Sequence, residues 1–334
     1  MLIVLSHMIS RGFDFGGECG VSFFFMLSGF VLSLAYGEKV ADGTFRTRPF
    51  VLRQLLKFYP LHLLMLIAFV VLDARLERYY DWQHLLPNIL LLQSWIPCEE
   101  YYFVANGSSW FLCNIVFFYL VFGYAYRLLN RLSITYLLVF GVAVLGGYIL
   151  LAFSIPVELV NSILYASPAT RLIDFCMGIL LCRLYRSNIG CEWGRRIKES
   201  SYTALTFREI CLVAMLAASF FAYELLTIRL RCAAFFWLVI PPILLFFAVS
   251  DRQGGRITSI LHHPVLLWCG SISLEIYLVH MLVFRIVDSF LSATGITSEA
   301  LQAVAGMMVL FPIAWFTKRY FVDKIYGSLI KLVV

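Results

Sequence analysis

The sequence predicts an all-α membrane protein, a polytopic bundle of about ten transmembrane helices. Of its 334 residues, 61% are hydrophobic and only 14% are charged, whereas soluble domains average about 25% charged residues. The mean hydropathy is +0.86. Apolar runs of roughly 18 to 25 residues recur, which is the length that an α-helix needs to cross a bilayer. The short alternating segments typical of a membrane β-barrel do not occur in the sequence.

Ten apolar runs can be assigned to these helices. The run at 1–9 is a stub, because a helix of that length rises only about 14 Å, roughly half of the hydrocarbon thickness. We therefore expect Met1 to be an internal methionine and the first helix to be truncated. The nine full-length runs are 20–36, 50–73, 109–128, 133–153, 164–184, 206–226, 232–249, 264–287 and 300–320.

The distribution of Lys and Arg among the loops predicts an orientation. Most loop Lys and Arg follow the second, fourth, sixth, eighth and tenth runs, with the largest group after the sixth, and the alternate loops hold only Arg11, Arg75, Arg78, Arg229 and Arg231. Loops rich in Lys and Arg face the cytoplasm, so both termini are expected to be cytoplasmic and the turn 7–20 to face outward. We predict one membrane domain, 1–334, with no soluble module and no cleavable signal peptide.

The charge and cysteine content exclude other classes of protein. A net charge of +6 would suggest nucleic acid in a soluble protein, but here the basic residues lie in short loops that set orientation. No nucleic-acid partner is therefore expected. Most of the nine cysteines lie inside apolar runs, without CxxC or Cys/His spacing, and buried Cys behaves as a small hydrophobe. We expect neither a disulfide framework nor a metal site.

Ionisable side chains inside the apolar runs are the first candidate functional residues, because such groups are costly in lipid. His7 ends the first run beside a Gly-rich turn, and its imidazole suits a general base. Arg171 and Asp174 lie in the outer third of the sixth run and either neutralise each other or act in catalysis. Glu275 is expected in the middle of the ninth run, with His280 nearer the outer surface.

Four further polar residues are candidates, and each has a structural alternative. Ser28 is either a nucleophile or a small residue that permits close helix packing. Asn114 opens the fourth run and could donate a hydrogen bond to developing charge. Arg53 and Lys57 lie near the inner face of the third run, where they either bind an anion or anchor the orientation of the helix.

Several segments, in this order, resemble acyltransferase family 3. They are HMISRGFDFGGECGVSFFFMLSGFVLS, RQLLKFYPLHLL, SSWFLCNIVFFYLVF, SPATRLIDFCMGILL and WCGSISLEIYLVH, and the Trp110 segment resembles the subgroup with a WFL pattern. This resemblance implies a bacterial inner-membrane enzyme with about ten helices. It also implies transfer of an acyl group, usually acetyl, from cytoplasmic acyl-CoA to a cell-surface carbohydrate outside, such as exopolysaccharide or O-antigen.

The resemblance also implies roles for particular residues. The functional His of the family corresponds to His7, and its basic residues at the start of the third helix correspond to the stretch with Arg53 and Lys57. The chain departs from the family pattern at three places: Ser22 replaces an acidic residue, Gln54 and Lys57 replace a pair of Arg, and Ile115 replaces a Glu.

Two mechanisms remain open from the sequence. In one, His7 deprotonates a sugar hydroxyl that attacks the thioester, while Arg171 or Asn114 stabilises the oxyanion. In the other, Ser28 or His7 forms a covalent acyl-enzyme. A different class of function, a carrier or flippase for a glycan or lipid-linked sugar, explains the intramembrane polar residues but not the family motifs. Consumption of acyl-CoA that depends on His7 would distinguish the enzyme from the carrier.

Overall fold

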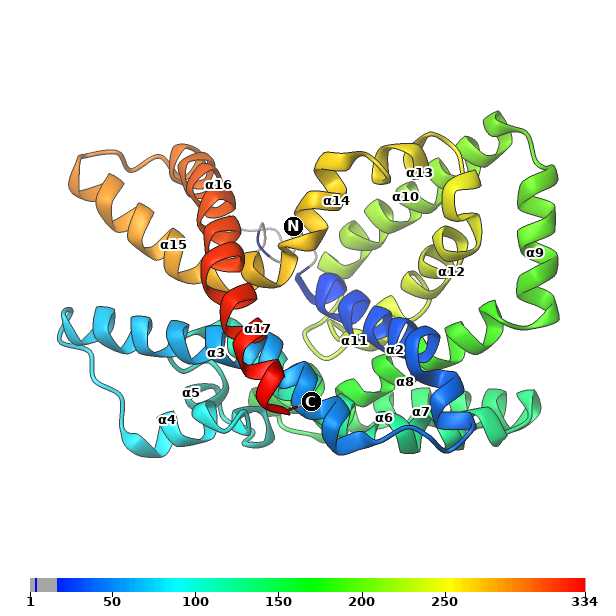
Figure 1. The fold of residues 1–334 in the computed structure, drawn as a ribbon, viewed down its shortest axis with the longest axis horizontal. Coiled ribbons are helices and arrows are strands. Elements are labelled where there is room, and N and C mark those ends of the chain that lie inside the picture. The colour runs from blue at the N-terminus through cyan, green and yellow to red at the C-terminus, as the bar shows by residue number, and fades with distance from the viewer. Residues whose placement is uncertain (1–3, 5–16, 334) are drawn as a thin grey trace. The chain divides into compact units, whose positions relative to one another are not determined.

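Every element in the described part of the chain is a helix (Figure 1). The computed structural model describes residue 4 and residues 17–333, and no strand occurs in them. Seven of these described helices are long and apolar enough to cross a membrane, or eight if the bent pair Val157–Ala166 and Pro168–Tyr185 forms one span. The predicted all-α, multi-span fold class is therefore confirmed.

Two predicted runs are divided in the structure. The run 232–249 forms α11 (Ala233–Phe236) and α12 (Ile240–Ser250), because the prolines that follow Ile240 fit only the first turn of a new helix. With 11 residues, α12 rises about 16 Å, too little to cross the hydrocarbon layer. The run 264–287 forms α14 (Pro264–Ser271) and α15 (Ser273–Ala293), and only α15 qualifies as a span.

The chain forms two compact units, each of which is described by itself. In its described part, the first contains residues 46–120 and 269–333. In it α15 packs along α16 (Glu299–Phe316), and α15 and α17 (Asp323–Val333) both contact α3 (Thr47–Ala74) (Figure 1). Its remaining elements are α4 (Trp82–Ile89), η1 (Gln93–Trp95), α5 (Glu99–Tyr102), η2 (Gly107–Ser109), the first half of α6 (Trp110–Arg131) and η6 (Thr317–Val322).

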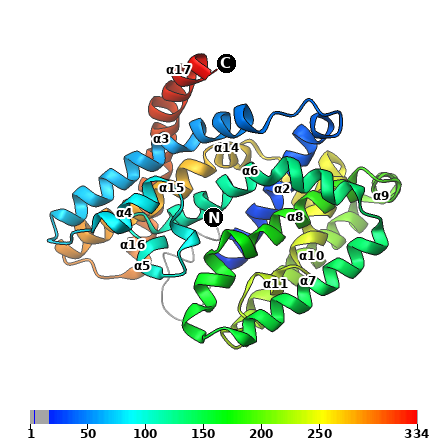
Figure 2. The same ribbon diagram turned by 90° about the horizontal axis from the view of Figure 1, so that it is seen from below.

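The second unit contains residues 18–45 and 121–268. The helix α2 (Gly17–Ala41) lies beside α8 (Pro168–Tyr185), as Figure 2 shows, and α12 packs on both α8 and α9 (Asn188–Glu199). Its core is apolar and includes Met26, Phe30 and Phe236. The other elements are the second half of α6, α7 (Ile134–Ser154), η3 (Val157–Leu159), η4 (Asn161–Ala166), α10 (Tyr202–Glu224), α11, η5 (Asp251–Gln253), α13 (Arg256–Leu261) and most of α14.

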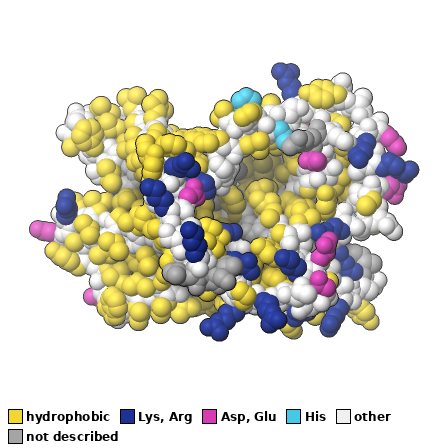
Figure 3. Space-filling view, in the orientation of Figure 1, with side chains coloured by type: hydrophobic (Ala, Val, Ile, Leu, Met, Phe, Trp, Pro, Cys, Tyr) yellow, Lys and Arg dark blue, Asp and Glu magenta, His cyan; other side chains and the backbone are white. Residues whose placement is uncertain are grey.

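Hydrophobic side chains cover much of the surface that Figure 3 presents. Large apolar residues such as Phe140, Leu150 and Met308 are more than half exposed. A soluble protein rarely exposes so much contiguous apolar surface, but a bundle surrounded by lipid does. This surface agrees with the membrane-spanning helices that the sequence predicts.

The segment 74–108 contains short helices joined by turns, and no spanning helix lies within it. Trp82 and Trp95 are 65% and 45% exposed, as aromatic anchors at a membrane interface are. Its conformation is held by polar contacts: the amide of Asn88 donates to the carbonyl of Val104 and to the Ser109 hydroxyl, and the His62 ring contacts the Asn88 carbonyl at 3.0 Å. The segment is thus a structured cap on α3.

Two glycines allow α2 and α8 to approach closely. A Cβ atom added to Gly29 would collide with the backbone carbonyl of Phe175, and one added to Gly178 would collide with that of Met26. Small residues of this kind let helix backbones meet in a membrane. Close helix packing is one of the two roles predicted for Ser28. The residue that makes the close contact with α8 is its neighbour Gly29.

We predict that Gly178→Ala destabilises the second unit, because backbone atoms cannot move aside as a flexible side chain can. Overpacking of this kind costs about 1–3 kcal/mol, which lowers the midpoint of thermal unfolding in detergent. Gly141→Ala is the matched control, since nothing lies within 4 Å of a Cβ at Gly141. Equal midpoints for the two variants would show that α2 and α8 do not pack in this way.

Candidate active site

Arg171 lies at the centre of a buried charge cluster in the second unit. Its side chain is 0% exposed, and its guanidinium donates to Glu18 at 2.5 Å and to the Ser22 hydroxyl at 2.9 Å. Asp174 lies 3.2 Å from the same guanidinium. The predicted contact between Arg171 and Asp174 is therefore present, but it is one part of a larger network.

The local sequence explains how this cluster forms. Pro168 occupies the first turn of α8, where proline fits, and Arg171 and Asp174 follow three residues apart on one face. Glu18 and Ser22 lie four residues apart on α2, so they also share a face. The resemblance implies an acidic residue at the position of Ser22, and in this chain Glu18 supplies a carboxylate one turn earlier.

The cluster brings one guanidinium and two carboxyl groups together in an apolar surrounding. Asp174 also accepts a hydrogen bond at 2.5 Å from the indole N–H of Trp237, and the Phe25 ring lies 5.1 Å from the guanidinium carbon. Burying ions is costly unless each has a partner. Because its guanidinium contacts Glu18 and Ser22 of α2 and Asp174 of α8, Arg171 joins these two helices.

We predict that Arg171→Met destabilises the protein by about 3–5 kcal/mol, since it leaves two buried carboxylates without their cation. The triple variant Glu18→Gln, Arg171→Met and Asp174→Asn removes all three charges and should recover most of the loss. Thermal unfolding of the purified protein in detergent measures both. A triple variant no more stable than the single one would contradict a stabilising role based on charge pairing.

His280 lies in the first unit, where the segment before α6 contacts α15. Its ring is 0% exposed, and Nδ1 lies 2.6 Å from the carbonyl oxygen of Tyr277. Since a carbonyl only accepts, Nδ1 carries a proton. His280 is thus a buried imidazole whose ring orientation is fixed, next to the WFL segment.

Hydrogen bonds hold that segment to α15. The amide of Asn106 donates to the Leu278 carbonyl at 3.0 Å, the Tyr277 hydroxyl donates to the Ser108 carbonyl at 2.9 Å, and the Ser108 hydroxyl donates to the Tyr277 carbonyl at 3.4 Å. Irregular backbone inside a membrane protein needs such partners. The contacts bring together two of the segments that carried the family resemblance.

Glu275 lies at the start of its span rather than in the middle, where we expected it. The spanning helix α15 begins at Ser273, so Glu275 is in its first turn. Its buried carboxylate lies 3.7 Å from the ammonium group of Lys318 in η6. This ion pair joins α15 to η6, which gives Glu275 a structural partner.

Asn114 and Ser28 form hydrogen bonds within their own helices. The amide of Asn114 donates to the Trp110 carbonyl at 3.1 Å, and the Ser28 hydroxyl donates to the Phe24 carbonyl at 2.8 Å. Asn114 is fully buried, whereas Ser28 is partly buried. These bonds hold both side chains against their own helices, and the partners of Arg171 on α2 are Glu18 and Ser22 rather than Ser28.

Arg53 and Lys57 are exposed on α3, one turn apart. Arg53 Nε donates to the Pro49 carbonyl at 3.2 Å, and Lys57 Nζ donates to the Gln54 amide oxygen at 2.9 Å. Among the described residues, neither forms an ion pair. Two like charges at this spacing repel each other by a few tenths of a kcal/mol, and an anion bound between them would relieve that repulsion.

His7 lies outside the described residues. The structure therefore describes the scaffold that follows it, beginning with Glu18 in the first turn of α2. Within residues 17–333, no group of three or more His, Cys, Asp or Glu side chains is arranged to hold a metal ion.

The comparisons with known proteins identify the family. The acyltransferase domain model of family 3 matches residues 1–319. The chain belongs to this family. It is also 29% identical, over 287 residues, to acyltransferase MdmB of Streptomyces mycarofaciens, in a match that covers 80% of this chain and 68% of that relative. No solved structure matches the chain. The predicted family is confirmed, and its general activity is acyl transfer.

Several residues around these groups are not among the candidates that the sequence predicts. Glu18, Trp237, Asn106 and Tyr277 all contact the candidate residues or their neighbours. A signal was present for Glu18, because an acidic residue at the start of an apolar run needs a cation. No such signal marks Trp237, which lies 63 positions from Asp174 in the chain.

Proposed function

We propose that this family 3 protein is a membrane O-acyltransferase that moves an acyl group, typically acetyl, from cytoplasmic acyl-CoA to a hydroxyl of an extracytoplasmic carbohydrate. The observation that carries this proposal is the match of the acyltransferase family over residues 1–319. The name of the relative supports the same chemistry. We further propose that residues 1–334 act as one functional domain in the bacterial inner membrane, with cytoplasmic termini.

The exposed cations at the beginning of α3 support a phosphate-rich donor. Arg46, Arg48, Arg53 and Lys57 are all exposed, from the residue before this helix to its third turn. Cations at a helix N-terminus oppose the helix dipole, so Arg46 and Arg48 do not stabilise the beginning of α3. Acyl-CoA brings several phosphate charges, which these four groups and the positive helix end would attract.

His7 is the proposed general base. It would take the proton of the acceptor hydroxyl while the oxygen forms a bond to the thioester carbon. The C–S bond would then break, and the leaving CoA sulfur would take this proton from the His7 imidazolium, which releases the CoA thiol and restores the neutral base. In this assignment Arg171 holds the helix that follows His7, rather than donating to the oxyanion. Asn114, His280 and the backbone N–H groups near the WFL segment are the proposed polar groups around the reacting carbonyl.

The first test is hydrolysis and transfer of acetyl-CoA in proteoliposomes. We expect His7→Ala to lower acceptor-dependent cleavage of the thioester by about 100-fold or more, because general-base catalysis contributes that much. His263→Ala is the control, since His263 is exposed in the turn before α14. Thioester cleavage that is unaffected by His7→Ala would refute the proposed base. Movement of unmodified glycan without cleavage would instead identify a carrier.

The second test concerns the donor site. Arg53→Ala combined with Lys57→Ala should raise the Michaelis constant for acetyl-CoA about 100-fold or more, because each of the two lost contacts to a charged group costs about 1.5 kcal/mol or more. The turnover number should change little, since these residues are not placed at the reacting atoms in this proposal. Arg127→Ala, another exposed arginine, is the matched control. An unchanged Michaelis constant would leave both residues as anchors of helix orientation.

A further inference from the structure

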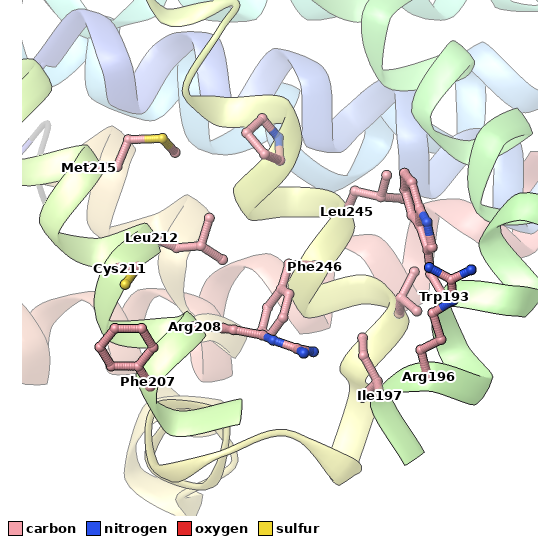
Figure 4. A pocket seen from close by; sticks show the side chains of 12 residues that line it. Trp193, Arg196, Ile197, Phe207, Arg208, Cys211, Leu212, Met215, Leu245 and Phe246 are labelled. Atoms are coloured by element: carbon pink, nitrogen blue, oxygen red, sulfur yellow. The ribbon is translucent and has the colours of Figure 1, made fainter. Parts of the chain in front are cut away.

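The second unit contains an apolar groove, and none of the residues that line this groove takes part in the proposed reaction. It has a volume of about 650 Å³ and opens between α10 and α12, with α9 beside it (Figure 4). Phe207, Leu212 and Met215 of α10 line one wall, and Leu245 and Phe246 of α12 line the other. Phe207 is 68% exposed, so the groove is open to the surroundings of the protein.

Two arginines lie in this apolar groove. In Figure 4, Arg208 extends from α10 beside Phe246, and Arg196 extends from α9 on the other side. Arg196 contacts Glu192 at 2.5 Å, and Arg208 donates to the Ser200 hydroxyl at 3.3 Å. Each guanidinium has five N–H donors, so both retain donors for a second acceptor. In the described residues Arg208 has no carboxylate partner.

The charged and apolar parts of the groove are arranged along its length. Met215 lies seven positions beyond Arg208 on α10, which corresponds to a rise of about 10 Å. On α12, Val249 lies beside Gly194 of α9, and Pro242 lies seven positions before it in the chain. One end of the groove is therefore cationic, and the rest is apolar for a length that fits part of an acyl chain.

The helix α9 has the pattern of a helix at the membrane surface. Ile189, Trp193 and Ile197 recur every four residues and form an apolar stripe. Its last turns carry Arg195, Arg196 and Lys198. Helices with an apolar stripe, a basic face and a Trp lie in the interface between lipid and water. Such a position would place the two groove arginines at the level of lipid headgroups.

We propose that this groove is a binding site for an anionic phospholipid, with one acyl chain between α10 and α12 and the phosphate held by Arg196 and Arg208. A neutral lipid would leave the cationic end without a counter-charge. A free phosphate would leave the exposed aromatic wall in water. The basic residues Arg186, Arg195 and Lys198, which line an adjoining pocket of about 720 Å³, add to the preference for a negative headgroup.

The test uses quenching of Trp193 fluorescence by brominated lipids. The protein is reconstituted in phosphatidylcholine vesicles that contain a small fraction of dibrominated phosphatidylglycerol or dibrominated phosphatidylcholine. We expect phosphatidylglycerol to quench more strongly at equal fraction, and the difference to disappear in Trp193→Phe. Arg196→Gln with Arg208→Gln should weaken the preference by roughly 30-fold, about fivefold for each arginine. Both arginines are exposed, so the helical content should not change.

Arg127→Gln is the matched control, because Arg127 is an exposed arginine of the same unit that lines neither this groove nor the adjoining pocket. It should retain most of the preference for phosphatidylglycerol. Equal quenching by the two lipids in the unmodified protein would overturn the proposal. So would a preference that survives in the double variant or in Trp193→Phe, since the lipid would then bind elsewhere. The readout does not involve acyl transfer, so its outcome is independent of the proposed reaction.

Discussion

The ion cluster around Arg171 is the interaction on which the second unit depends. A guanidinium that is fully excluded from solvent is stable only beside anions, and both α2 and α8 supply one. The glycine contacts between the same two helices allow the backbones to come close enough for this pairing. Electrostatic and steric requirements therefore select a single register of α2 on α8, and α2 is the helix that follows the segment with His7 in the chain.

The first unit depends on a different kind of interaction, because its chain between α4 and α6 is irregular and its polar groups need hydrogen-bond partners. The chain turns several times between α4 and α6, and lipid offers no hydrogen-bond partners for its polar groups. The Asn88 amide and the Tyr277 hydroxyl donate to the carbonyls of Val104 and Ser108 in this segment. The side chains of Asn106 and Ser108 in turn donate to carbonyls of α15. The same hydrogen bonds place the WFL segment next to His280, so one network both satisfies the backbone and organises the neighbourhood of a candidate catalytic group.

The fold class could be predicted because hydropathy alone determines which segments can cross lipid. The prediction failed where a local break divides an apolar run, as at the prolines after Ile240 and at Ile272 before α15. That break changes the interpretation of Glu275 from a central intramembrane acid to the partner of Lys318. The contact of Arg171 with a carboxylate three residues away was predictable because helix periodicity relates such neighbours. The contacts of this cluster with α2 and with Trp237 were not, because they join segments that are distant in the chain.

A carboxylate partner within the fold distinguishes the cations with a structural role from those that we propose to bind a ligand. Arg171 and Lys318 each contact a carboxylate that is at most 5% exposed, so their charges are compensated within the fold. Arg53, Lys57 and Arg208 have no such carboxylate in the described chain, and all three are exposed. A cation that the fold does not neutralise must be solvated or must meet an anion from outside. In our proposals these anions are the phosphates of the acyl donor for Arg53 and Lys57, and the phosphate of a bound lipid for Arg208.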